Sequence, residues 1–196
     1  FELKENDEMH YVCAFTQHES YKIVISNEEV DFSMTYSLRK FAFDDFNTYK
    51  IIAKEDNTDN YNSRMISCFI IPEWHDIVVF YLKAADNNYE NAYYAIDFYH
   101  YNLVKKNTVQ KDKVDEPNSG IGILFRAFHL KERWAAFIYF KDKWGTNLKF
   151  EIAELNGGET NRRFDIRSEK TFNNFGFAPH VNFNDFFKVD ENRLVK

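Results

Sequence analysis

Short apolar runs separated by polar turns make up most of the chain. In residues 65–71 and 76–83, apolar residues follow one another or alternate with polar ones, and the turn Pro72-Glu73-Trp74-His75 joins the two runs. Runs of this length and alternation are typical of β-strands, whereas an amphipathic helix would repeat its apolar residues every 3.6 positions. The pattern therefore predicts an all-β protein made of antiparallel strands.

The same pattern returns along the chain. Residues 68–71 and 76–81 align without a gap on residues 126–129 and 134–139, and an earlier copy starts at Val12-Cys13-Ala14-Phe15, with a polar turn at Gln17 to Ser20. A further copy begins at Phe186-Phe187-Lys188-Val189. Such internal similarity indicates a repeat protein. The predicted units span approximately residues 11–64, 65–122 and 123–181, with the start of a fourth at 182–196.

Each complete unit is predicted to form four strands. Asn156-Gly157-Gly158-Glu159 is a strong hairpin signal, because Asn and Gly accept positive φ angles. In the third unit the strands are expected near 123–130, 134–140, 147–155 and 161–167. In the second unit they are expected near 65–71, 76–83, 92–99 and 102–106, followed by a charged linker from Val109 to Gly120.

Four antiparallel strands in about 55–59 residues resemble a β-propeller blade. The glycine pair of kelch blades and the Trp-Asp ending of WD blades are absent, so the resemblance is to the architecture and to no specific family. It implies a single repeat domain over 1–196 that forms part of a propeller. Because three and a half blades do not close a ring, we expect the other blades on a partner chain or in the remainder of a larger polypeptide. A β-sandwich is the alternative.

Composition supports a sheet-rich core. Aromatic residues form 18% of the chain and favour half-buried pleated surfaces. The net charge of −6 gives no reason to expect nucleic acid or an anionic membrane as partner. No apolar stretch reaches the roughly 18 residues that a membrane span requires.

The two cysteines, Cys13 and Cys68, fall on corresponding positions of the first two units in the repeat alignment. Corresponding positions of neighbouring blades lie close together, so a disulfide between Cys13 and Cys68 is geometrically plausible. Two buried thiols are the alternative. Neither cysteine belongs to a Cys-x-x-Cys motif, and we predict no metal site and no cofactor.

Other polar residues are candidate sites. Trp74-His75-Asp76 contains a His–Asp pair that can serve acid–base chemistry but is more typical of an exposed turn. We predict no catalytic residue and favour a non-enzymatic protein. The residues predicted to lie in partner-binding loops are Asp56, Asp59, Trp74, His75, Asp86, Lys111 and Asp115.

These observations favour a protein-interaction or structural module, with an extracellular or cell-surface assembly as the expected setting. The expected partner is another protein or the rest of a larger polypeptide. A propeller lectin that binds carbohydrate through its aromatic residues and a propeller hydrolase are the alternatives. Packing between sheets is the expected use of most aromatic residues.

Overall fold

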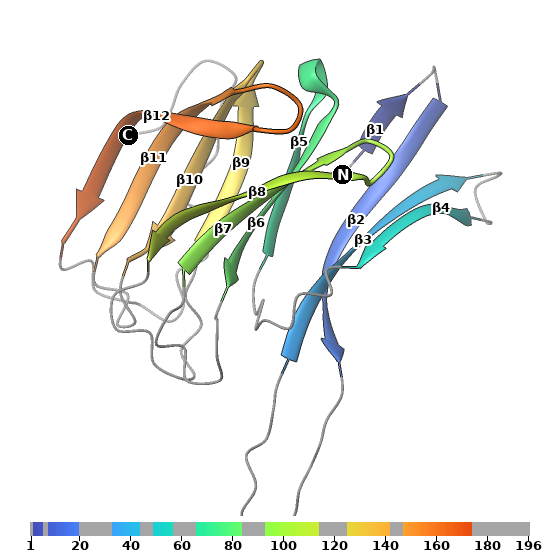
Figure 1. The fold of residues 1–196 in the computed structure, drawn as a ribbon, viewed down its shortest axis with the longest axis horizontal. Coiled ribbons are helices and arrows are strands. Elements are labelled where there is room, and N and C mark those ends of the chain that lie inside the picture. Colours follow the sequence, from blue (N-terminus) through green and yellow to red (C-terminus); the bar gives the residue numbers. More distant parts are fainter. Residues whose placement is uncertain are drawn as a thin grey trace, which may run out of the picture.

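The computed structural model describes residues 2–5, 8–19, 33–43, 49–56, 66–83, 93–113, 125–141 and 147–173. Most of these residues belong to β-strands, which confirms the all-β prediction. The strands form three four-stranded antiparallel sheets, and within each sheet neighbouring strands follow one another in the chain (Figure 1). No helix in the described ranges is long and apolar enough to cross a membrane.

The first sheet contains β1 (Glu2–Glu5), β2 (Glu8–Glu19), β3 (Ser33–Phe43) and β4 (Tyr49–Asp56). The second contains β5 (Ile66–Ile71), β6 (Asp76–Lys83), β7 (Tyr93–His100) and β8 (Lys105–Lys113), with the short 3-10 helix η1 (Pro72–Trp74) between β5 and β6. The third contains β9 (Phe125–Lys131), β10 (Trp134–Phe140), β11 (Leu148–Asn156) and β12 (Arg163–Phe172). The predicted four-strand composition of the second and third units is confirmed.

Two sequence-based predictions of local structure are wrong. The segment from Val109 to Lys113 belongs to β8 and not to a linker, because it pairs with β7. The polar stretch from Gln17 to Glu19 continues β2 instead of forming a turn, because it pairs with β3. The run that starts at Val12 therefore lies in the second strand of its sheet, one strand later than the repeat alignment predicts.

The second sheet lies between the other two (Figure 1). One face packs on the third sheet through a core that includes Phe80, Phe98 and Phe137. The opposite face packs on the first sheet through a core that includes Val12 and Tyr81. The central strands β6 and β7 are consequently buried on both faces, and each buried Phe or Leu side chain stabilises the fold by about 1.5–3 kcal/mol.

Direct hydrogen bonds also join the second and third sheets. Strands β5 and β9 lie side by side, and Ser67 Oγ both donates to Ala127 O at 2.8 Å and accepts from Ala127 N at 2.9 Å. At another point of the interface, the Tyr94 hydroxyl donates to the Phe140 carbonyl at 2.8 Å. These bonds satisfy polar groups that packing removes from water.

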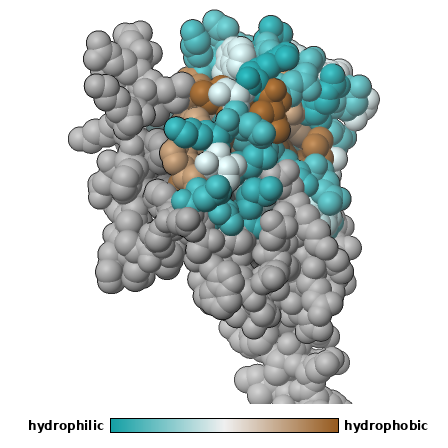
Figure 2. Space-filling view, turned by 90° about the vertical axis from the view of Figure 1, so that its left-hand side faces the viewer, coloured by the Kyte–Doolittle hydropathy of each residue, from teal (hydrophilic) through white to brown (hydrophobic). Residues whose placement is uncertain are grey.

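Strand β12 ends the described part of the third sheet, with β11 as its paired neighbour. Most of its side chains are exposed, whereas those of β10 are buried almost throughout. Figure 2 shows the side of the molecule on which β12 lies, where hydrophilic residues surround a few hydrophobic ones. The sheet therefore changes from a packed interior at β10 to a largely polar outer strand.

Candidate functional site

Four short turns of the second and third sheets lie at one end of the molecule (Figure 1). They connect β5 with β6, β7 with β8, β9 with β10, and β11 with β12. In an antiparallel meander, the first and third turns must lie at the same end, and packing of two such sheets brings both pairs of turns together. A network of polar contacts joins these turns.

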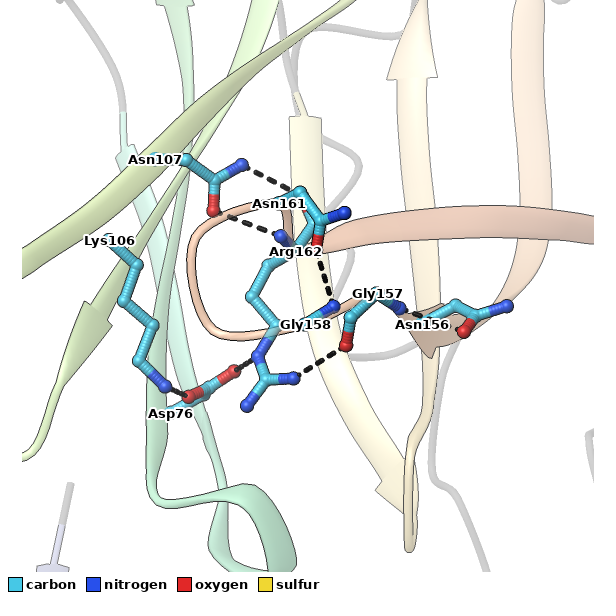
Figure 3. Close-up of polar contacts among 8 residues, drawn as sticks. All are labelled: Asp76, Lys106, Asn107, Asn156, Gly157, Gly158, Asn161 and Arg162. Atoms are coloured by element: carbon cyan, nitrogen blue, oxygen red, sulfur yellow. Dashed lines mark hydrogen bonds and ion pairs between the residues drawn. The ribbon is translucent and has the colours of Figure 1, made fainter.

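The network is centred on Asp76, the first residue of β6, whose side chain is completely buried. Arg162, from the turn before β12, donates through Nε to Asp76 Oδ2 at 2.8 Å. Lys106 of β8 pairs with Oδ1 of the same carboxylate (Figure 3). Both cationic side chains are themselves less than a tenth exposed, so this is an ion triad removed from water.

Arg162 is held from several further directions. Its Nη1 donates to the Gly157 carbonyl at 2.8 Å, and its guanidinium lies 4.1 Å from the ring centroid of Trp74. The Asn107 side chain of β8 forms two hydrogen bonds with the Arg162 backbone (Figure 3). Its Oδ1 accepts from Arg162 N at 3.1 Å, and its Nδ2 donates to Arg162 O at 2.8 Å. Planar guanidinium groups suit such combined hydrogen bonding and stacking. The third sheet's last turn is therefore locked to the second sheet.

The turn before β12 has the residues that its geometry requires. Gly157 adopts φ 92°, and a Cβ atom there would lie 2.2 Å from the Asn161 carbonyl oxygen. The Asn156 side chain accepts from Gly157 N at 2.8 Å, and the Asn161 side chain accepts from Gly158 N (Figure 3). The Asn-Gly hairpin signal is thus confirmed, and the turn presents Arg162 to Asp76.

Trp74 and His75, both predicted to be in a partner-binding loop, do lie in this turn region. Trp74 is half-buried and packs against the core beneath Arg162, whereas His75 is exposed and its ring contacts Tyr101 at 5.2 Å between centroids. His75 adopts φ 52° as the residue that ends η1. The His75–Asp76 pair considered for acid–base chemistry points apart, because the Asp76 carboxylate turns inward to Arg162 and Lys106.

A second buried carboxylate, Glu151 of β11, lies between the same two sheets. Tyr139 donates to its Oε1 at 2.9 Å, Lys149 pairs with Oε1 at 2.8 Å, and Lys111 pairs with Oε2. Burial by itself raises the pKa of Glu151, but the charge of Lys111 and the hydrogen bonds from Lys111, Lys149 and Tyr139 outweigh it, so the pKa is lowered.

Lys111 is therefore not the partner-binding loop residue that the sequence predicts. It belongs to β8, its ammonium group reaches across to the third sheet, and it lies 4.8 Å from the ring centroid of Phe137. A run of alternating charges looks like a solvated loop in sequence, but the period-two alternation of a strand directs one side chain inward.

A third buried carboxylate, Asp97 of β7, repeats the Glu151 arrangement within the second sheet. Tyr81 donates to Asp97 Oδ1 at 3.3 Å, Thr108 donates to Oδ1 at 2.5 Å, and Lys105 pairs with Oδ2 at 3.1 Å. Burial, followed by the nearby Asp97 charge, raises the pKa of the Tyr81 hydroxyl, so this group stays a hydrogen-bond donor.

The two Tyr–carboxylate pairs occupy equivalent places in their sheets. Asp97 pairs across strands with Val79, and Glu151 pairs in the same way with Phe137, two residues before Tyr81 and Tyr139 respectively. In the sequence, Tyr94-Ala95-Ile96-Asp97 aligns with Phe150-Glu151-Ile152-Ala153, so Asp97 falls opposite Ala153 and its equivalence with Glu151 is missed. Both units have a Tyr in the second strand and an acidic residue in the third, and an alignment based on these residues would have identified the equivalence.

The remaining predicted site residues are not brought together. Asp56 is the last residue of β4, while Asp59, Asp86 and Asp115 lie outside the described residues. Cys68 is half-buried in β5, the first strand of its sheet, whereas Cys13 lies in β2, the second strand of its sheet. Strand β2 nevertheless lies beside β5, as β5 lies beside β9, so the strand order does not contradict their predicted equivalence. The Cys13 side chain lies outside what the structure describes, so the disulfide stays a prediction.

Replacement of the central carboxylate should destabilise the protein strongly. Asp76→Asn keeps the shape of the side chain but leaves Lys106 and Arg162 buried without a counter-charge, and breaking a buried ion pair costs about 3–5 kcal/mol. Chemical denaturation followed by circular dichroism measures the change. Glu159→Gln, on the exposed part of the turn before β12, is the control and should stay within about 0.5 kcal/mol. Equal midpoints for the two variants would contradict a stabilising role.

The turn before β12 gives a matched pair of glycine substitutions. Gly157→Ala should lower the free energy of unfolding by more than about 1 kcal/mol, because the residue has positive φ and its Cβ would clash with backbone. Gly158→Ala should lower it less, because the nearest atom is the side-chain oxygen of Asn161 at 3.1 Å. Thermal unfolding of both variants tests this order, and a larger loss of stability for Gly158→Ala would contradict the positive φ and close backbone contact of Gly157.

The lowered pKa of Glu151 predicts a specific pH dependence of stability. The folded protein favours the ionised carboxylate, so this contribution is complete above the ordinary pKa of 4.5 and is lost as the pH falls through the lower folded value. Wild type should therefore be more stable than Glu151→Gln at pH 7, and the difference should shrink below about pH 4.5. Urea unfolding from pH 3 to pH 7 measures it. Glu169→Gln is the control, since Glu169 is 57% exposed. A difference independent of pH would contradict the assignment.

Comparison with known proteins adds no identity to this geometry. No family model, curated protein or solved structure matches the chain. Within the ranges that the structure describes, no group of three or more His, Cys, Asp or Glu side chains is arranged to hold a metal ion. The candidate site is thus defined by its own contacts: a rigid set of turns fastened by buried ion pairs.

Proposed function

We propose that the three sheets are consecutive blades of a β-propeller. A β-sandwich encloses one core between two sheets, whereas here the second sheet has a core on each of its faces. Each sheet is a meander of consecutive strands, and the first strands of the second and third sheets lie side by side. Both features are expected where successive blades pack around an axis with their first strands innermost.

We further propose that the protein is a non-enzymatic interaction module whose binding surface is the turn face, defined as the exposed residues of the four turns. Six of them represent it: His75, Asn102, Val104, Glu132, Arg133 and Glu159. Val104, the last residue of the turn between β7 and β8, is 57% exposed. An apolar side chain among polar and charged ones matches the mixed chemistry of protein-binding surfaces.

The observation that carries this proposal is the ion triad behind the turn face. Asp76, Arg162 and Lys106 fix turns from both sheets in one arrangement without being exposed themselves. Binding is favoured when loops are already ordered, because the conformational entropy has been lost during folding and not at the moment of binding. The buried charges therefore support a rigid platform.

The buried carboxylates support a structural role over a catalytic one. Asp76, Asp97 and Glu151 are each paired with lysine or arginine in the interior. The aromatic residues support packing over carbohydrate stacking, since Phe80, Tyr94 and Tyr139 are buried between sheets. Both groups of side chains are used within and between the sheets, whereas the turn face is accessible to a partner.

A matched pair of double variants tests the proposed binding surface. Val104→Asp with Thr160→Lys changes the turn face, while Ser168→Asp with Thr171→Lys makes the same change of charge on the exposed strand β12. Immobilised wild type and both variants are incubated with extract of the source cells, and retained proteins are quantified by mass spectrometry. We expect at least one protein to be retained about tenfold less by the turn-face variant than by wild type and by the control, roughly 1.4 kcal/mol of binding free energy.

The proposal fails if wild type and both variants retain the same proteins in equal amounts, or if wild type retains nothing beyond an unrelated immobilised protein. Circular dichroism of each variant confirms that folding is unchanged. All four substituted positions are exposed, so the substitutions should leave stability within about 0.5 kcal/mol of wild type.

A further inference from the structure

Part of the face of the third sheet that points away from the second sheet is apolar and buried. It includes Ile138 and Phe140 of β10 and Leu148 of β11, which are 1%, 2% and 6% exposed. Phe128 and Phe150 pack against these three residues. We call these five residues the outer face of the third sheet. Its composition is that of an interior surface and not of an exposed one.

Equivalent positions show what this face is built to contact. Ile77, Val79 and Tyr81 of β6 face the preceding sheet, and their counterparts Ala135, Phe137 and Tyr139 of β10 also face the preceding sheet. The intervening residues Val78, Phe80 and Leu82 face the following sheet. By the alternation of a strand, their counterparts in β10, which include Ile138 and Phe140, face a following sheet too.

The cross-strand pairs extend this equivalence to the neighbouring strand. In the second sheet, Phe80 pairs with Ile96 and Leu82 with Tyr94, and all four side chains belong to the core shared with the third sheet. In the third sheet, Ile138 pairs with Phe150 and Phe140 with Leu148, all four on the outer face. The third sheet thus has apolar cross-strand pairs at the same positions as the pairs through which the second sheet packs on the third.

We infer that residues 182–196, the next copy of the repeat after β12, pack on the outer face of the third sheet. Each described sheet packs on the one before it in chain order, so the next copy of the repeat is the occupant that continues the series. The sequence of 182–196 begins a further copy of the repeat, although it lies outside the described residues. This inference rests on the proposed series of blades.

Arg126 gives the most direct point of contact to test. In the second sheet, Ser67 pairs with Phe80 and hydrogen-bonds to Ala127 in the first strand of the next sheet. Arg126 pairs with Ile138 and therefore holds the place of Ser67 in the third sheet. The fourth copy of the repeat places Phe186 at the position of Cys68 and Ala127. We expect residues 126 and 186 to lie close together.

Cross-linking between engineered cysteines tests this expectation in the full 196-residue chain. Arg126→Cys and Phe186→Cys are combined in a background in which Cys13 and Cys68 are replaced by serine, and a short bismaleimide is added. We expect an intramolecular cross-link at a yield at least tenfold above that of the control pair Val104→Cys with Phe186→Cys. Val104 lies in the turn between β7 and β8, away from the outer face.

Two results would overturn the inference. Equal yields from the test and control pairs would show that the segment does not lie at the outer face, and cross-linked dimers in place of monomers would show that a second copy covers it. Phe187→Cys in place of Phe186→Cys gives a second cross-linking position on the same segment. Circular dichroism confirms that each variant is folded. The turn face consists of other residues than the outer face. The cross-linking result therefore does not depend on whether the turn-face variant loses a binding partner in the cell-extract experiment.

Discussion

The structure depends on the burial of the second sheet on both of its faces. A sheet in this position must leave no polar group without a partner, because an unpaired buried carboxylate costs several kcal/mol. Asp76 and Asp97 are both completely buried in this sheet, one directed to the third sheet and one to the first. The packing therefore requires a cationic partner for each carboxylate. Asp76 is paired with Lys106 and Arg162, and Asp97 is paired with Lys105.

The same constraint explains why polar contacts join the second and third sheets at separate points. Arg162 reaches Asp76 at the turn end, and Lys111 reaches Glu151 further along the interface. Ser67 and Ala127 are bonded between the first strands. Apolar packing is not directional and tolerates sliding, whereas these bonds are satisfied in one relative position only. They therefore specify how the two sheets are aligned, which in turn fixes the turn face.

The strands were predictable where each one carries its own signal. The apolar runs of β6 and β10 and the Asn-Gly turn before β12 are local features, and their predicted positions agree with the structure. Partners across sheets were not predictable in this way. Lys111 belongs to a charged stretch that resembles a solvated loop, and Arg162 begins a largely polar predicted strand. Only the relative position of two sheets shows that both cations are buried.

Register errors account for most of the other differences. A register shift between Trp134 and Ala135 places Ala127, and not Arg126, at the position of Cys68, which a gapless alignment cannot represent. In the first sheet, β1 precedes the run that contains Cys13 and is an additional strand that the repeat alignment does not predict. An alignment that also required the Tyr–carboxylate pairs to coincide would have corrected the third strand of each unit.

Native-state hydrogen exchange of backbone amides tests the central claim most directly, because it reports how far each strand is protected from opening. If the second sheet is the buried centre of the series, the amides of β6 and β7 should be among the slowest to exchange, together with those of β10, and the amides of β12 should exchange much faster. Exchange in β6 and β7 as fast as in β12 would show that the second sheet is not enclosed by its neighbours, and the account built on its burial would be wrong.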